Sequence, residues 1–501
     1  MRRILAYDLG TSGVKASLYD ETGKLLAAHY GQYATLYPAD GFREQRPGDW
    51  WNRIKQVTKA ITAQCGAEDI AAIGVSGHSL GVVAVDASGR LLSETTPIWS
   101  DARAVIQADN FFEKTDYRQW YEVTGNGFPR HLYAIFKQMW LKDNEPEMYG
   151  KTACFLGSKD YINLLLTGEM VTDRSYASGS GVYSLAEEEY IDEYLECAGI
   201  DRKKLPRVVN SDEVMGYVTS KSAEELGICP GIPVVAGGVD NACMTLGADC
   251  WRAGDAYASL GTSAWVTVCA DAPSVNFEAK TYTFAHCVQG QYLPSAGIFS
   301  SGSSLEWMIQ NLHIGTMHGE KVYDALSAMV RSVPAGANGL LFVPNLAGGS
   351  AFDPSPDVRG LLAGMDLKHT EADVARAVYE GIAMHLRCAY DVLVSGAPIR
   401  EKLLLVGGAA KSAEWRSIYA SVFDIPVLKT AVIQDAASLG AAALAAVGTE
   451  IWKDYRPLSA AHGAGELTYP DKTEADVYRK LLSKYKKICI LTQDIAEIMR
   501  T

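Results

Sequence analysis

Tyr7-Asp8-Leu9-Gly10-Thr11-Ser12-Gly13, near the start of the chain, is partly repeated by Ser259-Leu260-Gly261-Thr262-Ser263 about half a chain later. In both places Leu-Gly-Thr-Ser separates two apolar runs, so each copy predicts a hairpin turn between two strands. Glycine lets backbone N–H groups approach an anion closely, and the hydroxyls add further donors. The repeat therefore predicts two facing cradles for phosphate oxygens, one formed by Gly10, Thr11 and Ser12 and the other by Gly261, Thr262 and Ser263.

The two turns differ in the residue that precedes them, which is Asp8 in the first copy and Ser259 in the second. A carboxylate beside a phosphate site can hold a magnesium ion, so Asp8 is the candidate metal ligand. These residue types also form ordinary polar turns, but the duplication and the buried-strand setting favour a binding role. Lys15, two positions past Gly13, either faces the same anion or is a solvated strand lysine.

The size and composition of the chain limit the number of domains, the partners and the cellular compartment that can be expected. Its 501 residues are too many for one hydrophobic core and predict two domains, which we place at residues 1–247 and 248–501. The formal net charge is −13 and no Lys/Arg-rich run occurs, which argues against nucleic acid and membrane as partners. No apolar stretch is long enough to span a bilayer, the first residues predict a strand and not a signal peptide, and the ten cysteines form no CxxC pair. These features predict a cytoplasmic protein with reduced thiols.

Strand-like and helical patterns alternate in both halves, which predicts an α/β fold. We expect buried strands at residues 70–76, 81–86, 232–240 and 402–408. We expect helices from Pro47, from about Ser300 and from about Glu371, and a tightly packed helix at residues 436–446.

Asp240 follows an apolar strand in Gly237-Gly238-Val239-Asp240-Asn241, at the point where the crevice of an α/β sheet opens. It is a candidate for the N-cap of the next helix. It is equally a candidate for the base that accepts the proton of a substrate hydroxyl during phosphoryl transfer. The two roles do not exclude each other.

Other candidates have a plain structural alternative. Gly407 and Gly408 end a strand where a flat ligand can approach the backbone, but such pairs also serve helix–strand packing, and Gly302 is ambiguous in the same way. Asp101 and Arg103 either form a salt bridge or, with Trp99, contact a sugar. His78, at a strand end beside glycines, is either a core histidine or a pocket residue.

Taken together, these residues resemble the FGGY family of carbohydrate kinases. The similarity runs from Tyr7–Lys15 to Ser438-Leu439-Gly440 and so covers nearly the whole chain. Further marks of the family lie at Pro97–Arg103, Lys159–Tyr161, Leu166–Glu169, Gly237–Ala242, Ser259–Ser263, Arg376–Gly381 and Gly407–Ala409. Their order and spacing make the resemblance specific.

The resemblance implies two actin-like ATPase (ribonuclease H-like) domains around a cleft, with ATP mainly on the C-terminal domain and the sugar mainly on the N-terminal one. It implies that Asp240 is the catalytic base and that Asp8 helps to hold Mg²⁺. The expected nucleotide contacts are Gly10, Thr11, Ser12, Lys15, Gly261, Thr262, Ser263, Gly302, Gly407, Gly408 and Ser412. The expected substrate contacts are His78, Ser79, Leu80, Trp99, Asp101, Arg103, Asn241 and Trp265.

Two departures from the family pattern concern the sugar. Members that act on D-xylulose carry Gln-Met-His-Gly where this chain has His78-Ser79-Leu80-Gly81, and glycerol kinases carry Arg-Glu there. The family's Gly-Glu-Arg-Thr-Pro stretch is replaced by Gly348-Gly349-Ser350-Ala351-Phe352. A hydroxylated carbon chain remains the expected ligand.

The expected reaction is transfer of the ATP γ-phosphoryl group to a terminal hydroxyl of a ketose, with D-xylulose as the first candidate. Ribulose, erythritol, glycerol and gluconate are alternative acceptors. An actin-like ATPase that phosphorylates nothing, and a sugar-binding protein without turnover, are rival classes. The residues leave the oligomeric state open, and the resemblance suggests a homodimer.

Overall fold

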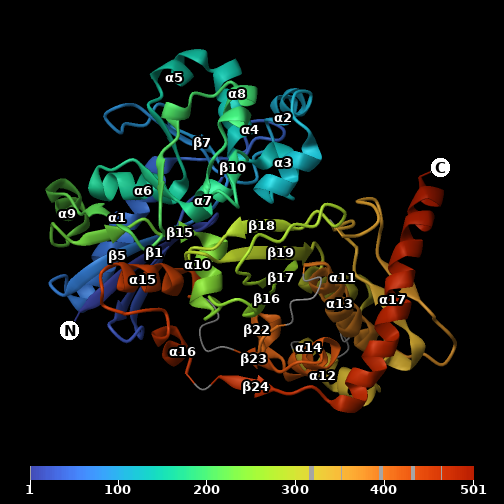
Figure 1. Cartoon of the computed structure of the whole chain (residues 1–501). Helices are drawn as coiled ribbons and strands as arrows, with labels where there is room; N and C mark the ends of the chain where they lie inside the picture. The colour runs from blue at the N-terminus through green and yellow to red at the C-terminus, as the bar shows by residue number, and fades with distance from the viewer. Residues whose placement is uncertain are drawn as a thin grey trace.

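The computed structural model describes residues 2–314, 321–350, 352–393, 399–429, 435–463 and 465–500. Two seven-stranded sheets form the frame of this part of the chain. In Figure 1 the first sheet lies at the left, where β1 and β5 are drawn in blue, and the second lies near the centre, where β16 to β19 are labelled. The fold is mixed α/β, as predicted.

The first sheet has the order β13-β14-β5-β1-β2-β3, with β15 paired to β5. β1, β2 and β3 form an antiparallel meander, whereas β5 and β14 run parallel to β1. Leu9 pairs with Val14, which confirms the hairpin turn at Gly10–Ser12. The strands are β1 (Arg3–Leu9), β2 (Gly13–Asp20), β3 (Leu25–Gln32), β5 (Ile70–Gly77), β13 (Val214–Tyr217), β14 (Pro233–Val235) and β15 (Gly238–Val239).

The second sheet, of order β18-β19-β17-β16-β22-β23-β24, repeats this plan. β16, β17 and β19 form the meander, and β22 and β23 run parallel to β16. Leu260 pairs with Ala264, so the second copy of the motif is also a hairpin turn. The strands are β16 (Ala256–Leu260), β17 (Ala264–Val268), β18 (Tyr282–Ala285), β19 (Tyr292–Ile298), β22 (Leu403–Val406), β23 (Val427–Lys429) and β24 (Glu466–Thr468).

Helices form where the apolar residues recur at helical spacing. α1 (Pro47–Cys65) begins at Pro47, whose missing N–H costs nothing in a first turn, and it buries Trp50, Ile54 and Ile61. α13 (Glu371–Leu393) packs on the second sheet, as expected. The other helices of the second half are α11 (Gly302–Leu312), α12 (Val322–Ser332), α14 (Ala413–Phe423), α16 (Pro457–Ala461) and α17 (Lys472–Met499).

A helical insertion stands above the first sheet in Figure 1 and contributes to the site. Its helices are α2 (Val105–Phe112), α3 (Tyr117–Thr124), α4 (Ala134–Asn144), α5 (Pro146–Lys151) and α8 (Asp192–Ala198). Buried aromatic rings, among them Phe111, Trp120 and Phe136, form its core. α6 (Ser158–Thr167) and α7 (Arg174–Ser178) lie between it and the sheet, and α9 (Ser220–Leu226) packs on α1 and α6.

Short strand pairs complete the described structure. They are β4 (Glu44–Gln45) with β7 (Thr96–Pro97), β6 (Val83–Val85) with β8 (Cys154–Leu156), β9 (Val171–Asp173) with β12 (Arg207–Val209), β10 (Tyr183–Ser184) with β11 (Glu189–Tyr190), and β20 (Leu341–Val343) with β21 (Leu361–Ala363).

Two strand predictions need correction. The strand expected at residues 81–86 is only β6, and it pairs with β8 outside the main sheet. The strand expected at 232–240 is broken at Gly237, whose φ of +72° is in the left-handed region. A Cβ at Gly237 would lie 1.9 Å from the carbonyl oxygen of Val75, so this position requires glycine. The break leaves Asp240 as the first residue of a helix.

The two sheets are joined by α10 (Asp240–Gly247) and α15 (Ala436–Gly448), which is the buried helix predicted at 436–446. Their backbones nearly touch: a Cβ at Gly440 would lie 1.9 Å from the oxygen of Cys243, and one at Gly247 would lie 1.8 Å from that of Ala436. α15 also packs on β1 and β5 of the first sheet. One apolar cluster consequently extends from Ile4 to Leu404.

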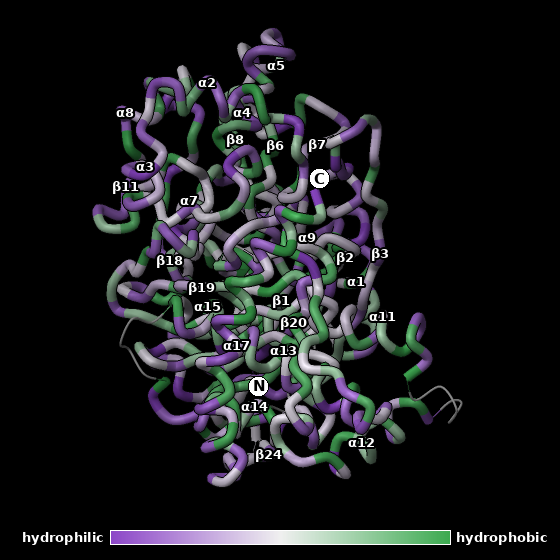
Figure 2. The backbone as a smooth tube through the Cα atoms, turned by 90° about the vertical axis from the view of Figure 1, so that its right-hand side faces the viewer, coloured by the Kyte–Doolittle hydropathy of each residue, from purple (hydrophilic) through white to green (hydrophobic). Residues whose placement is uncertain are grey.

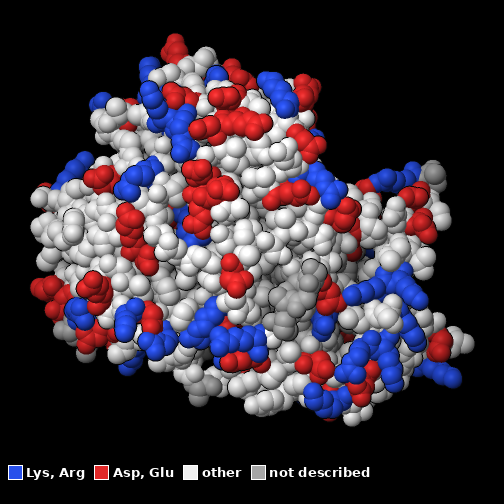
Figure 3. Space-filling view, viewed as in Figure 1, with Lys and Arg blue, Asp and Glu red and all other residues white. Residues whose placement is uncertain are grey.

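Hydrophobic and charged residues are distributed differently over this architecture. In Figure 2 hydrophobic stretches, in green, gather in the interior around β1 and β20. Figure 3 shows acidic and basic side chains interspersed on one face, with the basic ones densest at the lower right, over α17. Several of these pair with acids, such as Lys486 with Asp391. All ten cysteines are free, and no helix among the described residues is long and apolar enough to span a membrane.

Replacement of Gly440 by alanine should destabilise the junction between the sheets. The new methyl group would meet backbone and not a movable side chain, so we expect unfolding free energy to fall by about 1–3 kcal/mol or more. Gly150→Ala in α5 is the matched control, because its Cβ meets nothing within 4 Å and alanine is the better helix former, by about 1 kcal/mol. Urea denaturation of both variants measures the difference. Wild-type stability in Gly440→Ala would contradict the close helix contact.

Candidate active site

Two cavities meet at the second hairpin turn. The Trp99 cavity, of about 560 Å³, is lined by residues of both halves, including Thr11, Trp99, Asp240 and Ser263. The Trp415 cavity, of about 890 Å³, is lined by Gly261, Thr262, Gly302, Gly408, Ser412 and Trp415. The turn at 261–263 therefore borders both cavities. Because Thr11 and Ser263 share one of them, the two turns face each other.

The strand register brings the two candidate carboxylates to one end of the first sheet. Asp8 of β1 lies opposite Ser76 of β5, and Ser76 lies opposite Gly238 of β15. Ser76 Oγ donates a hydrogen bond to Asp8 Oδ1 at 3.2 Å. Asp240 follows two residues after Gly238 and opens α10. This arrangement is the crevice at the carboxyl ends of parallel strands that the sequence predicts.

Burial governs the protonation of both acids. Burial, together with the nearby charge of Asp8, raises the pKa of Asp240 to about 7. Burial raises the pKa of Asp8 to about 6, against the opposing effects of the Ser76 hydrogen bond and of Lys15. A carboxylate with a pKa near neutrality is a much stronger base than an exposed aspartate.

Trp99 connects the wall of its cavity to the first turn. Its indole Nε1 donates to Thr11 Oγ1 at 3.0 Å, and its side chain is 41% exposed. The same cavity is lined by four of the other residues expected to contact the substrate, Ser79, Leu80, Asn241 and Trp265; that role stays a prediction. A polar end near Asp240 and Asn241 and an aromatic wall suit a hydroxylated ligand with a carbon face.

Glycines shape the Trp415 cavity. Gly407 has a φ of +98°, and a Cβ there would lie 2.3 Å from the oxygen of Leu260, so the strand end packs directly on the second turn. A Cβ at Gly408 would meet nothing within 4 Å, although Gly408 lines the cavity. Ser412 caps α14 through a hydrogen bond from Trp415 N. The Tyr379 and Trp415 rings stack at 4.2 Å.

Several predicted contacts lie outside both linings. Asp101 is fully buried and accepts two hydrogen bonds from Arg103, each at 2.8 Å, which supports the salt-bridge alternative. His78 is buried edge-on against Trp50, and burial lowers its pKa to about 4, as for a core histidine. Lys15 pairs with Asp435, just before α15.

The first turn contributes to the cavity through one side chain. Thr11 lines the Trp99 cavity, whereas Gly10 and Ser12 do not. Gly10 instead closes the hairpin by donating its N–H to the oxygen of Gly13 at 3.0 Å. Asp8 lies behind the turn, at the end of β1.

The sequence-based search missed the aromatic wall of the Trp99 cavity. Phe128 of the insertion stacks on Tyr282 of β18 at 4.3 Å, and Phe299 and Phe352 come from the second half. These residues belong to four separate segments, and a lone aromatic residue carries no signal for a pocket. Trp415 was visible beside the Gly407-Gly408 motif, but its stacking on Tyr379 depends on the packing of α13 on α14.

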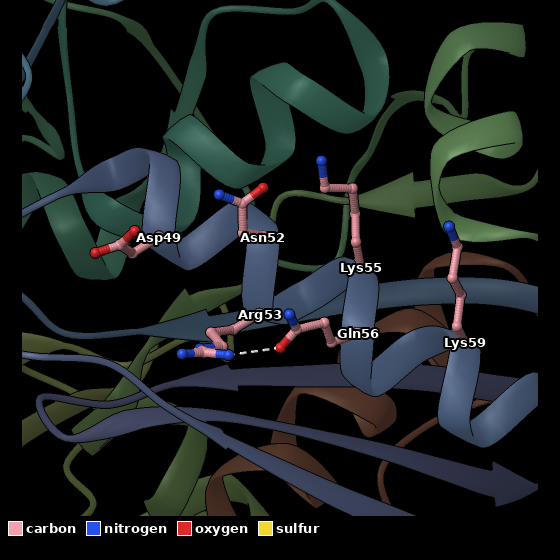
Figure 4. A pocket seen from close by; sticks show the side chains of 6 residues that line it. All are labelled: Asp49, Asn52, Arg53, Lys55, Gln56 and Lys59. Atoms are coloured by element: carbon pink, nitrogen blue, oxygen red, sulfur yellow. Dashed lines mark hydrogen bonds between the residues drawn. The ribbon is translucent and has the colours of Figure 1, made fainter.

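A third hollow, shown in Figure 4, lies along the exposed side of α1. All six of its lining side chains come from this one helix, and apart from the pair Arg53 and Gln56 they do not point toward a common centre. Arg53 donates to Gln56 at 2.7 Å. One helix face cannot enclose a ligand, so we assign this hollow no function.

No group of three or more His, Cys, Asp or Glu side chains suited to a metal occurs among the described residues. Asp8 and Asp240 together still fit a magnesium ion, because protein sites for Mg²⁺ commonly use one or two carboxylates and leave other positions to substrate phosphates. Burial makes ionisation of both carboxyl groups unfavourable, and a bound cation would offset that cost.

Comparison with known proteins identifies the family. The N-terminal domain of the FGGY family of carbohydrate kinases matches residues 3–247, and its C-terminal domain matches residues 256–449. The chain belongs to the FGGY family. It is a carbohydrate kinase, and its two sheets with their helices are actin-like ATPase folds.

Similar proteins of this family differ in substrate. The xylulose kinase of Bacillus subtilis is 29% identical over 508 residues, covering 100% of this chain and 99% of that protein. The gluconokinase of the same organism is 28% identical over 486 residues, covering 96% and 94%. The crystal structure of the xylulose kinase from Rhodospirillum rubrum matches with a TM-score of 0.91 at 28% identity, over 99% of this FGGY chain and 100% of that one.

Replacement of Asp240 by asparagine should stabilise the protein in a pH-dependent way. The folded-state pKa is about 7, above the model-peptide value of 3.8, so ionisation of Asp240 costs stability as pH rises from about 4 to 7. Asparagine removes that cost. We expect the Tm advantage of Asp240→Asn over the wild type to be small at pH 4 and to grow up to pH 8, measured by calorimetry without metal. An advantage that does not change with pH would contradict the raised pKa.

Proposed function

We propose that this protein transfers the γ-phosphoryl group of ATP to a terminal hydroxyl of a ketose or a related polyhydroxylated acceptor. ATP would occupy the Trp415 cavity, and the acceptor would occupy the Trp99 cavity. The observation that carries the proposal is the turn at 261–263, which borders both cavities within reach of a half-buried carboxylate. A phosphoryl group that moves from ATP in the Trp415 cavity to an acceptor in the Trp99 cavity would pass this turn, because the turn lies between the two cavities.

In this proposal Asp240 is the general base. It orients the acceptor hydroxyl and takes its proton as the oxygen attacks phosphorus. Its neighbour Asn241 has a buried Oδ1 with no hydrogen-bond partner among the described residues, which leaves one acceptor for a second hydroxyl. Thr11 and the Trp99 indole, already joined by a hydrogen bond, position the substrate against the first turn. Positioning of this kind supplies much of the acceleration in phosphoryl transfer.

Backbone and hydroxyl donors of the two turns would hold the phosphates. The residues assigned to this role are Gly10, Thr11, Ser12, Gly261, Thr262 and Ser263. Asp8 would hold Mg²⁺, which neutralises phosphate charge when bound. Gly302, Gly408 and Ser412 would line the adenosine part of the site, where small residues leave room.

The identity of the acceptor depends on the residues that depart from the family pattern. Ser79 and Leu80 replace the Met-His pair of the members that act on D-xylulose, and both line the Trp99 cavity. Phe352, from the second altered stretch, lines it too. D-Xylulose remains the first candidate because of the similar xylulose kinases, and gluconate is the second because of the similar gluconokinase.

Asp240→Ala should lower kcat by at least about a hundredfold, because it removes the base from the reacting hydroxyl. The KM for ATP should stay within about twofold of the wild type, since Asp240 does not line the Trp415 cavity. Asp49→Ala, at the start of α1 and outside both cavities, is the control. ADP release in a coupled assay measures both constants, and near-normal turnover in Asp240→Ala would remove it from the chemistry.

Gly408→Val should raise the KM for ATP about tenfold or more without unfolding the protein. Its side chain would enter the Trp415 cavity from a position with free space and ordinary backbone angles. Gly407→Val, by contrast, should lower Tm, because φ and the oxygen of Leu260 both exclude a side chain. Unchanged ATP affinity in a folded Gly408→Val would place the nucleotide elsewhere.

A panel of ketoses, polyols and aldonates tests the acceptor. We expect acceptor-dependent ADP release with one member of the panel, in a reaction that requires Asp240. ATP hydrolysis that no acceptor stimulates would instead favour an actin-like ATPase without a sugar substrate.

A further inference from the structure

A buried lysine lies behind the Trp99 cavity. Lys137 of α4 is 0% exposed, and its Nζ donates to three backbone oxygens: Leu80 at 3.0 Å, Trp99 at 3.3 Å and Leu132 at 2.6 Å. No carboxylate is within ion-pair distance of Nζ among the described residues. An ammonium group has three donors in a tetrahedral arrangement, and here all three are used on the main chain.

The three oxygens belong to three of the segments of the N-terminal half that form the cavity wall, besides the first turn at Thr11 and the start of α10. The side chains of Leu80 and Trp99 line the cavity directly. Leu132 ends the short turn that follows Phe128 and Pro129, which also line it. Lys137 thus connects these segments from behind, without contacting the cavity itself.

One of the three segments is strained. Leu80 has a φ of +59°, a left-handed conformation that is unfavourable for a residue with a side chain. The Leu80 side chain is nevertheless 2% exposed and packed in the core of the insertion. A charge-assisted hydrogen bond to its carbonyl oxygen helps to hold this conformation.

We propose that Lys137 is a positioning residue for the phosphoryl acceptor: its ammonium group holds the segments around Leu80, Trp99 and Leu132 at the spacing that fits the substrate. The role toward a phosphoryl acceptor rests on the proposed function. The connection of the three segments by Lys137 rests on the hydrogen bonds alone. Burial of a charge is costly unless several polar groups compensate it, and three carbonyl oxygens do so here.

The charge of Lys137 is sensitive to pH in the neutral range. Burial lowers its pKa to about 7, with Asp101 opposing and Arg103 adding to the shift. The other titratable groups that sense Lys137 are His78 and His131, and the lysine charge contributes to lowering both of their pKa values. His78, with a pKa of about 4, is neutral throughout the range in question. Above pH 7 the neutral amine has only two donors for three oxygens, so the wall should loosen.

The first test is Lys137→Met, which keeps the length of the side chain and removes the donors. We expect faster hydrogen exchange in residues 78–82, 97–101 and 128–133, with no change at 261–263 or 408–412. Lys142→Met is the matched control, because Lys142 is on the same helix and binds the oxygen of Gly199, outside the cavity. Unchanged exchange in the three segments would overturn the proposal, whatever the acceptor proves to be.

The second test is kinetic. Lys137→Met should raise the KM for the acceptor at least tenfold while the KM for ATP changes less than twofold. Equal changes in both constants would indicate a general structural role and overturn the proposal. In Lys137→Ala, added n-propylammonium, which replaces the missing part of the side chain, should lower the acceptor KM again. Equal rescue by uncharged n-propanol would show that the ammonium charge is not needed, and would overturn the proposal too.

The third test uses pH and does not require a lysine variant to fold. Acceptor affinity is measured by calorimetry in Asp240→Asn, so that Asp240 does not titrate. The acceptor Kd should rise several-fold between pH 7 and 8.5, a range above the Asp8 pKa of about 6, and a flat profile would contradict the role of the ammonium charge. If no panel member binds or reacts while the exchange pattern changes as expected, the proposed function fails and the positioning role of Lys137 stands.

Discussion

The close contact of α10 with α15 sets how far apart the two halves of the molecule lie. Glycines at 247 and 440 let the helix backbones approach with no side chain between them. α15 comes late in the chain yet packs on β1 and β5, while α10 starts at the end of β15. Because both hairpin turns and Asp240 are attached to elements that pack on this helix pair, the pair places Thr11 and Ser263 in one cavity.

The carboxylates at the strand ends are placed where folding alone does not favour them. Burial raises the pKa values of Asp8 and Asp240, so keeping both ionised at neutral pH costs stability. The same burial makes Asp240 a better base and makes Asp8 receptive to a cation. Function and stability are therefore opposed at this site, and the pH dependence of the Asp240→Asn variant measures that opposition.

Buried charge is used in two further ways in the N-terminal half. Arg103 pairs with Asp101 and also with Glu44 of β4, and so ties the Trp99 segment to that strand. Lys137 has carbonyl oxygens and no acid as its partners, which makes its charge conditional on pH. The Arg103 and Asp101 pair holds the fold in place, whereas Lys137 positions the wall of the Trp99 cavity. Ser79 and Leu80, which depart from the family pattern, lie next to Lys137, whose Nζ donates to the oxygen of Leu80.

Features that depend on local pattern could be predicted from the amino-acid sequence. The repeated Leu-Gly-Thr-Ser turns, the apolar strands around them, the helix at Pro47 and the membership of a carbohydrate kinase family could all be inferred from short stretches, since hydrophobic periodicity and turn residues act over a few positions. The strand predicted at 232–240 was wrong in part, because the close approach of Gly237 to Val75 is a contact between distant segments. The domain boundary at residue 247 stays a prediction.

Which side chains share a cavity, and which charged side chains are neutralised by a partner, could be known only from the folded chain. The sequence leaves open whether Asp101 and Arg103 contact a sugar or form a salt bridge. The hydrogen bonds from the Arg103 guanidinium group to Asp101 in the folded chain support the salt bridge. The aromatic wall and Lys137 had no signal in the sequence, because Phe128 stacks on a ring from the other half of the chain and two of the three oxygens that Lys137 binds lie dozens of residues away. Burial and the distance between charges set pKa values, and both arise only when segments from the two halves pack together.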